Sequence, residues 1–419
     1  MDGFTFVHCA DLHLDAPFEG LAAVAPQVRE CLREATFRAF ERIVDLARET
    51  QAAFLVIAGD VYDSGHHSLY AQIRFQEAVK RAAESGVEVF VAHGNHDPLS
   101  AWEAKLSLPP QVHRFSGAEV ECLPVRRQGA ELARVYGISF PVREVRENLA
   151  ARFPRKEGGS FAVGVLHANV GGNPAHDNYA PCSLANLTAT GLDYFALGHI
   201  HAPQVLREEG PCVVYAGTPQ GRHIREAGPR GCYVVQVGAD GRPRPRFVPT
   251  DVVRWHQETR SIEGLAHLDE LLEDLQAVRE RLREEAEGRG VIWRLHLAGR
   301  GELHERLLRL DPERDLAEAL RQGEGSRPDF VWLEGVFIAT RPAVDLEERR
   351  RAPDFLGEVL RAARRLREAD PAEILTLLRT RGGFHLLEDS LSRWSGADWE
   401  AAVGAAEAQA VDLLLRGEE

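Results

Sequence analysis

The sequence has no apolar run close to the roughly 18 residues that a membrane-spanning helix requires. It also lacks the charged and apolar segments of a secretory leader, because the residues after Met1 already have the pattern of a strand. The six cysteines are scattered, none of them in a Cys-x-x-Cys pair, and several fall in apolar strand-like segments. These absences predict a cytoplasmic protein with no membrane segment and with buried thiols in place of disulfides or zinc ligands.

Lysine is scarce, and the formal net charge is −14. Taken alone, this acidity argues against a nucleic-acid partner, because lysine and arginine carry phosphate binding. Most of the excess acid lies beyond residue 250, however. The charge therefore leaves a nucleic-acid partner open.

The length of 419 residues exceeds what one core usually supports, so we predict a large domain followed by smaller ones. The large domain begins with alternating strand and helix patterns, which are typical of parallel α/β sheets. Later strands, the last of them at 233–237, are joined by turns, which predicts a second, more antiparallel sheet packed on the first. Composition changes near residues 250 and 345 predict domains at 1–250, 251–345 and 346–419, the last of them helical.

Polar side chains gather directly after the predicted strands. Gly94-Asn95-His96-Asp97 follows the apolar run 87–92, and similar clusters occur at four other strand ends. Because α/β sheets bind ligands at the carboxyl ends of their strands, we expect all five clusters to converge on one site. The spacing predicts two metal ions that share Asp60. The first would be held by Asp11, His13 and His201, and the second by Asn95, His167 and His199.

Each cluster also has an ordinary interpretation, because an aspartate after a strand is more often a turn former and a lone histidine is more often a hydrogen-bonded residue. Five such clusters in a row favour the metal site. Oxygen and imidazole ligands without thiolate favour Mn²⁺ or Fe over structural zinc, and Mn²⁺ is our first choice. Two such ions about 3.5–4 Å apart can clamp a phosphate and activate water.

Arginines are concentrated after the last ligand motif. Arg242, Arg244 and Arg246 alternate with prolines after an Asp-Gly turn and should share one face of an edge strand, and Arg222 precedes them. These residues have two interpretations of equal weight. They are either a track for the DNA backbone or protection of an exposed sheet edge.

The ordered motifs resemble those of the calcineurin-like metallophosphoesterase superfamily. Within it, His8–Asp15 and Tyr215–His223 resemble the SbcD-like DNA exonucleases, most closely the YhaO-like bacterial branch. The resemblance covers residues 8–223. It implies an α/β fold with a four-layer αββα catalytic sandwich, a small DNA-contacting α/β cap, a partner-binding helical region, and two Mn²⁺ ions. It further implies that His96 is the proton donor, with Asp63 and Asp97 orienting His96 or the metal ligands.

The predicted function is a Mn²⁺-dependent DNA exonuclease of double-strand break repair, with endonuclease activity left open. The resemblance implies two partners, DNA and an SbcC-like coiled-coil ATPase held by the C-terminal helices, and it leaves a homodimer open. The ordinary interpretation of these helices is that they pack on the catalytic domain itself. One alternative is a metallophosphatase or phosphodiesterase that acts on a phosphoester other than DNA. Another is a non-enzymatic scaffold, against which the intact ligand motifs argue.

Overall fold

The computed structural model describes residues 3–21, 24–63, 68–101, 104, 106–172, 177–380, 388–391 and 394–415. The chain divides into two compact units. The first comprises Met1–Glu258, Asp274–Leu295 and Glu313–Val336, and the second comprises Thr259–Glu273, His296–Pro312 and Phe337–Glu419. The division into domains at 1–250, 251–345 and 346–419 stays a prediction.

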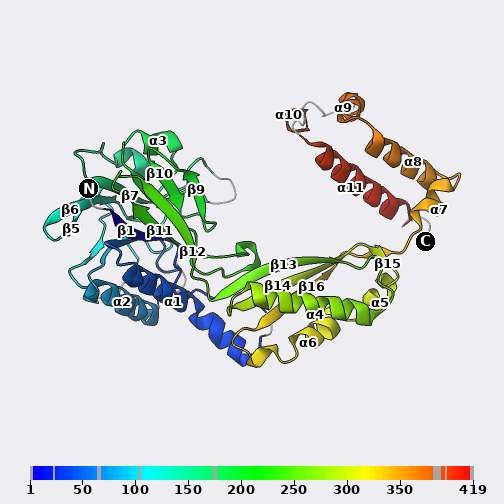
Figure 1. The fold of residues 1–419 in the computed structure, drawn as a ribbon, viewed down its shortest axis with the longest axis horizontal. Helices are drawn as coiled ribbons and strands as arrows, with labels where there is room; N and C mark the ends of the chain where they lie inside the picture. Colours follow the sequence, from blue (N-terminus) through cyan, green and yellow to red (C-terminus); the bar gives the residue numbers. More distant parts are fainter. Residues whose placement is uncertain are drawn as a thin grey trace. The chain divides into compact units, whose positions relative to one another are not determined.

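The first unit contains two six-stranded sheets. The first sheet has the order β12-β11-β1-β2-β3-β4, in which β1 to β4 are parallel and β11 is antiparallel to β1. Helices α1 and α2 cover one face of this sheet (Figure 1). The elements are β1 (Phe4–Cys9), α1 (Pro26–Glu49), β2 (Phe54–Ala58), α2 (Leu69–Glu84), β3 (Glu88–Ala92), β4 (Val112–Arg114), β11 (Gly231–Val237) and β12 (Pro243–Pro249).

The second sheet has the order β5-β6-β7-β8-β10-β9, and it is parallel from β6 to β10. Its outer face carries the short helices α3 and η1, which share a core with it. The elements are β5 (Glu121–Arg127), β6 (Ala130–Gly137), η1 (Leu149–Arg152), β7 (Phe161–His167), α3 (Leu184–Thr188), β8 (Tyr194–Gly198), β9 (Gln204–Arg207) and β10 (Cys212–Tyr215).

Successive side chains along each strand point to opposite faces of the sheet and so enter two different cores. In β2, Leu55 and Ile57 enter the core shared with α1 and α2, whereas Phe54 and Val56 enter the core between the two sheets. The strands of the second sheet divide their side chains in the same way between the inner core and the outer helices. The predicted four-layer αββα sandwich is confirmed.

Two details of the predicted topology are wrong. The second sheet is mixed, with a parallel centre, and β11 belongs to the first sheet, where Phe4 pairs with Val237. Short apolar runs predict strands well but carry no information about their partners, because pairing depends on contacts that are distant in sequence. The hairpin of β5 and β6 lies in a stretch that the sequence pattern left irregular.

Beyond the sandwich lies a three-stranded sheet with the order β13-β14-β16, accompanied by helices, as predicted for the small α/β region. The boundary between the two units falls within its strands. The elements are β13 (Val253–Ser261), α4 (Leu268–Glu285), β14 (Gly290–Ala298), β15 (Arg300–Gly301), α5 (His304–Arg309), α6 (Pro312–Arg321), β16 (Val331–Ile338) and β17 (Arg341–Pro342).

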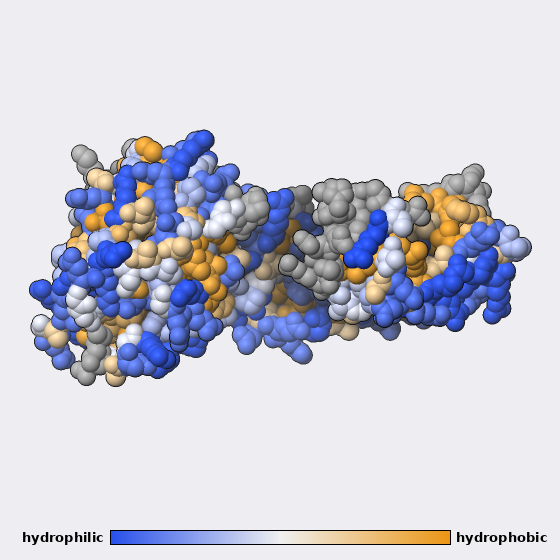
Figure 2. Space-filling view, turned by 90° about the horizontal axis from the view of Figure 1, so that it is seen from above, coloured by the Kyte–Doolittle hydropathy of each residue, from blue (hydrophilic) through white to orange (hydrophobic). Residues whose placement is uncertain are grey.

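The C-terminal region is helical, as predicted. Helix α8 packs on α11 through Leu360 and Val411, and ion pairs join Asp412 on α11 to Arg300 and Arg341. Hydrophobic residues also reach the surface of this region beside charged ones (Figure 2). None of the described helices has the length and apolarity to cross a lipid bilayer. The elements are α7 (Leu346–Arg351), α8 (Phe355–Glu368), α9 (Pro371–Arg379), α10 (Glu388–Leu391) and α11 (Gly396–Leu415).

Candidate functional site

The loops after β1 and β2 run side by side beyond the ends of the strands. The backbone N–H of Asp11 donates to the carbonyl of Gly59 at 3.0 Å, and the N–H of His13 donates to the carbonyl of Asp60 at 3.0 Å. The parallel pairing of β1 with β2 therefore continues into the two loops. This arrangement brings the first two ligand clusters to one edge of the sheet.

Glycines let the strand ends of the two sheets approach one another closely at this edge. A Cβ atom at Gly198, the last residue of β8, would lie 1.9 Å from the carbonyl oxygen of Ala58 in β2. A Cβ atom at Gly94, after β3, would lie 2.3 Å from Oδ1 of Asp60. A larger residue at either position would push the strand ends of the site apart.

The site concentrates backbone strain. Asp11, His13, Asp60 and His199 all have positive φ, at 51°, 42°, 52° and 99°. Such conformations cost roughly 1–3 kcal/mol each and persist only where the surroundings impose them. Here the N–H of His199 donates to both carboxylate oxygens of Asp11, at 3.0 and 3.2 Å, which ties the β8 loop to the β1 loop.

The residues predicted for the first ion lie together. Nε2 of His13 faces Nε2 of His201 at 3.2 Å, and Asp11 completes a compact group with them. His201 donates its Nδ1–H to Oε1 of Glu226 at 2.6 Å, so its Nε2 is the ring nitrogen that faces the group. Burial, and next the charge of Arg222, hold the pKa of His13 well below its usual value. Two imidazole Nε2 atoms that face one another in this way suit a shared cation.

The residues predicted for the second ion form an adjoining group. His167 donates its Nδ1–H to the carbonyl of Ala58 at 3.0 Å, which leaves the lone pair on Nε2. That atom lies 2.9 Å from Oδ1 of Asn95 and 3.4 Å from Oδ2 of Asp60. Burial lowers the pKa of His167 to about 4, so the ring is neutral at pH 7. The ring of His199 lies 5.2 Å from that of His167, and its Nε2–H donates to the carbonyl of Asp177 at 2.8 Å.

Asp60 lies between the two groups. Its Oδ2 is 3.9 Å from Nε2 of His13 on one side and 3.4 Å from Nε2 of His167 on the other. This is the location that a carboxylate shared by two ions requires.

The surroundings of the two buried carboxylates show that the site suits cations. Asp11 and Asp60 are fully buried, and no lysine or arginine in the described part of the chain forms an ion pair with either. Burial raises the pKa of Asp60 to about 7 and the pKa of Asp11 well above its usual value. Buried carboxylates are normally paired or bound to metal, so this ligand set fits divalent cations.

His96 and Asp63 lie beside this cluster at its solvent side. His96 donates its Nδ1–H to Oδ1 of Asp63 at 2.6 Å, and the two side chains are 31% and 22% exposed. Burial lowers the pKa of His96, but the hydrogen bond with Asp63 and the charges of Asp60 and Asp63 outweigh it, so the pKa lies above its usual value. The imidazoles of His13 and His96 hold the pKa of Asp63 well below its usual range.

Two supporting carboxylates fix the loops. Asp97 accepts the N–H groups of Gly94 and Val61 at 2.8 and 2.9 Å and the imidazole of His93 at 3.0 Å. Asp97 therefore fastens the loop after β3 to the loop after β2. His93 has no sequence signal beyond its neighbourhood. Glu226, which orients His201, was also missed, because a single glutamate distant from the motifs has no recognisable pattern.

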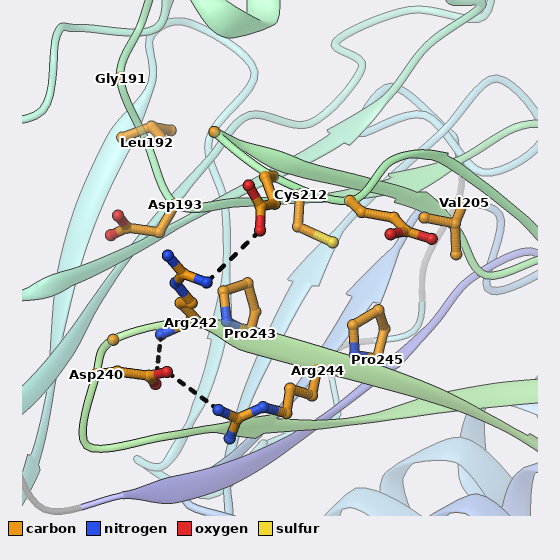
Figure 3. Close-up of a pocket in the computed structure, with 14 residues that line it drawn as sticks. Gly191, Leu192, Asp193, Val205, Cys212, Asp240, Arg242, Pro243, Arg244 and Pro245 are labelled. Atoms are coloured by element: carbon orange, nitrogen blue, oxygen red, sulfur yellow. Dashed lines mark hydrogen bonds and ion pairs between the residues drawn. The ribbon is translucent and has the colours of Figure 1, made fainter.

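The arginines on β12 and directly before it lie away from the ligand cluster. Arg242, Arg244 and Arg246 are exposed along an edge strand, as predicted. Pro243 pairs with Val237 of β11, and Val237 pairs with Phe4 at the start of β1, so Arg242 lies near that end of β1. The ligands follow the opposite end of β1. Arg244 pairs with Asp240 at 3.0 Å and Arg242 with Glu209 at 3.7 Å, at the rim of a cavity of about 740 Å³ (Figure 3).

Comparison with known proteins gives two family matches. Residues 4–203 match the calcineurin-like phosphoesterases, and residues 255–341 match the middle domain of the metallophosphoesterase YhaO. The chain is 35% identical over 333 residues to the uncharacterized metallophosphoesterase YhaO of Bacillus subtilis, which covers 78% of this chain and 80% of that protein.

More distant relatives have names that refer to DNA repair or to a nuclease. The DNA double-strand break repair protein Mre11 of Aeropyrum pernix is 29% identical over 50% of this chain and 52% of its own length. The SbcD component of the nuclease SbcCD of Bacillus subtilis is 21% identical over 53% of this chain and 63% of its own length. The chain therefore spans about half to two thirds of these two relatives.

We predict that Asp60→Asn abolishes the binding of at least one of two metal ions while the protein stays folded. Asparagine keeps the oxygen that accepts the N–H of His96 at 2.9 Å, but it removes the charge shared by the two groups. Mn²⁺ should raise the melting temperature of the wild type, because a hundredfold excess over Kd adds about 2.7 kcal/mol of stability. The variant should show a much smaller increase.

Elemental analysis of the dialysed proteins gives the stoichiometry. Asp193→Asn is a suitable control, because this carboxylate pairs with Lys156 away from the cluster. Two bound ions in the Asp60→Asn protein would remove Asp60 from the bridging role.

Proposed function

Because the chain belongs to the calcineurin-like phosphoesterase family and is therefore a phosphoester hydrolase, we propose that it is a Mn²⁺-dependent DNA nuclease of double-strand break repair. The names of its Mre11 and SbcD relatives support DNA as the substrate. The observation that carries the reaction is the His96–Asp63 pair beside the buried ligand cluster. We propose exonuclease action first, with endonuclease action as a second mode.

In this proposal the metal ligands are those predicted from the strand ends. Asp11, His13 and His201 would hold one Mn²⁺ ion, Asn95, His167 and His199 the other, and Asp60 both. Two ions bound there would polarise the phosphate and lower the pKa of a water molecule, so that hydroxide is available near neutral pH. The hard oxygen donors and the absence of thiolate among these residues support Mn²⁺.

His96 would supply the proton that the leaving oxygen needs. Its Nδ1–H is held by Asp63, so Nε2–H of the protonated ring is the group that would face a substrate. The raised pKa favours the protonated ring, which is the form that a general acid requires. Asp63 is thus a positioning residue for His96, and Asp97 is a positioning residue for the loop that carries both His96 and Asn95.

Partners follow from the same proposal. DNA is the substrate, and an SbcC-like coiled-coil ATPase would bind the C-terminal helices. Phe355, Leu377 and Leu413 support this, because their side chains are 67%, 58% and 62% exposed although they are apolar. A homodimer and a cytoplasmic location also stay predictions.

A phosphoester other than DNA is the second candidate. The net charge of −14 favours it, because an acidic protein repels the DNA backbone. End-labelled duplex DNA, incubated with and without Mn²⁺ beside a panel of nucleotides, phosphopeptides and activated diesters, separates the two candidates. Metal-dependent shortening of the DNA supports the nuclease. Turnover of another substrate with intact DNA would replace it, and no turnover at all would favour a scaffold.

We expect His96→Ala to slow cleavage of DNA about 100-fold or more, because a general acid contributes typically 10²–10⁴-fold. Cleavage of bis(p-nitrophenyl) phosphate should fall less than about tenfold, because its leaving group needs no proton. His113→Ala is a matched control, since His113 is also 31% exposed and also pairs with a carboxylate, Glu88. Equal losses on both substrates would exclude the acid role.

Replacing Arg242, Arg244 and Arg246 together by serine should weaken DNA binding and flatten its dependence on salt. The slope of log K against log salt should fall by about 0.9 for each phosphate that these arginines no longer bind. The control replaces three other exposed arginines, Arg126, Arg127 and Arg143. A slope that matches this control would assign the β12 arginines to edge protection.

We predict that Phe355→Glu, Leu377→Glu and Leu413→Glu together abolish co-purification with the ATPase, because charge cannot enter an apolar interface without a large cost. Hydrolysis of a small diester should be unchanged. Leu308→Glu, at a side chain that is 59% exposed on α5, should keep the complex. A chain ending at Pro353 should behave like the triple variant. Retention of the ATPase by both proteins would refute the proposed interface.

A further inference from the structure

We propose that Arg222 binds the substrate phosphate and that Glu226 is the positioning residue that holds both Arg222 and His201. Neither role is part of the ligand set or of the proton donor. The inference rests on the phosphoester chemistry of the site and not on DNA as the substrate, so it survives if the nuclease proposal fails.

Glu226 connects a candidate metal ligand to the backbone of Arg222. Its side chain is buried, yet it accepts the Nδ1–H of His201 through Oε1 at 2.6 Å and the backbone N–H of Arg222 through Oε2 at 2.7 Å. Burial raises the pKa of this carboxyl, but His201, Arg222 and the backbone donor together hold it well below its usual value. One ionised carboxylate therefore fixes a candidate metal ligand and the backbone of Arg222.

The backbone around Arg222 is held from other sides as well. Its carbonyl accepts the N–H of Glu19 at 3.0 Å, from the loop that follows His13. Gly221 packs so closely that a Cβ atom there would lie 2.7 Å from the carbonyl of Glu226. Thr218, earlier in the same segment, donates its hydroxyl to the carbonyl of Asp11 at 2.9 Å. Arg222 is thus attached to the same loops that carry the metal ligands.

The sequence assigned Arg222 only to a candidate track for the DNA backbone, together with the arginines at 242, 244 and 246. Within the described ranges the guanidinium of Arg222 forms no ion pair, and its Nε is buried without an acceptor. Arg230, in the same segment, shows the contrast, because its guanidinium donates to the carbonyls of Glu226, His201 and Ala227 at 2.6 to 3.0 Å. The guanidinium of Arg230 is therefore bound to backbone carbonyls of the fold. The donors of Arg222 are left for a ligand.

The charge of Arg222 acts at the cluster. After burial, it is the largest cause of the low pKa of His13, and it opposes the rise in pKa that burial gives Asp11. It also opposes the raised pKa of His96. The charge of the guanidinium is therefore felt by both the ligands and the proton donor. A planar fork of N–H donors is suited to two phosphate oxygens.

The test uses the full-length protein loaded with Mn²⁺ and inorganic phosphate as the probe. Calorimetry of Arg222→Ala should show phosphate binding weakened by roughly 10- to 100-fold, the range for a hydrogen bond between charged groups. KM for bis(p-nitrophenyl) phosphate should rise by a similar factor, and the manganese content should stay at the wild-type value. Arg222→Lys should recover part of the affinity, because it keeps the charge but loses the fork.

Arg225→Ala is the matched control, since this arginine lies in the same segment and is exposed. It should bind phosphate as the wild type does. Glu226→Gln should weaken both phosphate and Mn²⁺ binding, because it disturbs Arg222 and His201 together. Three results would overturn the proposal: Arg222→Ala binding phosphate like Arg225→Ala, loss of manganese from Arg222→Ala, or unchanged affinities in Glu226→Gln.

Discussion

The burial of two carboxylates is the constraint on which the rest of this structure depends. Asp11 and Asp60 lie at strand ends beside a second sheet, with no basic side chain in the described chain to neutralise them through an ion pair of lysine or arginine. The imidazoles of His13 and His167 are neutral, because burial that disfavours the carboxylate charge also disfavours a charge on these two rings. Two buried carboxylates without an ion pair to lysine or arginine in the described chain make the site suitable for cations that come from solution.

Such a site requires a rigid frame, since ligands that could separate would relieve the repulsion between them. The frame is made from ordinary backbone hydrogen bonds, from glycines that let the two sheets touch, and from supporting carboxylates. Asp97 fastens the β3 loop to the β2 loop, and Glu226 fastens His201 to the segment that carries Arg222. The strained φ angles at Asp11 and Asp60 show that this frame dictates the backbone against its own preference.

The part of the site that could be predicted from sequence is the part encoded locally. Asp60 directly follows an apolar strand, and Asn95 and His96 share one turn, so each placement needs only strand periodicity. Glu226 could not be found in this way, because its partner His201 is reached only through the folded chain. The return of β11 to β1 was missed for the same reason, since its apolar run would suit either sheet.

That return has a consequence for how the chain folds. Until β11 has been synthesised, β1 keeps one edge unpaired, and this edge is an apolar template for association with other chains. Pairing between segments so distant in sequence forms slowly, because the entropy cost of closing a long loop comes before the strands gain any hydrogen bonds. The first sheet is therefore completed late in synthesis, and the nascent protein is the form most exposed to aggregation.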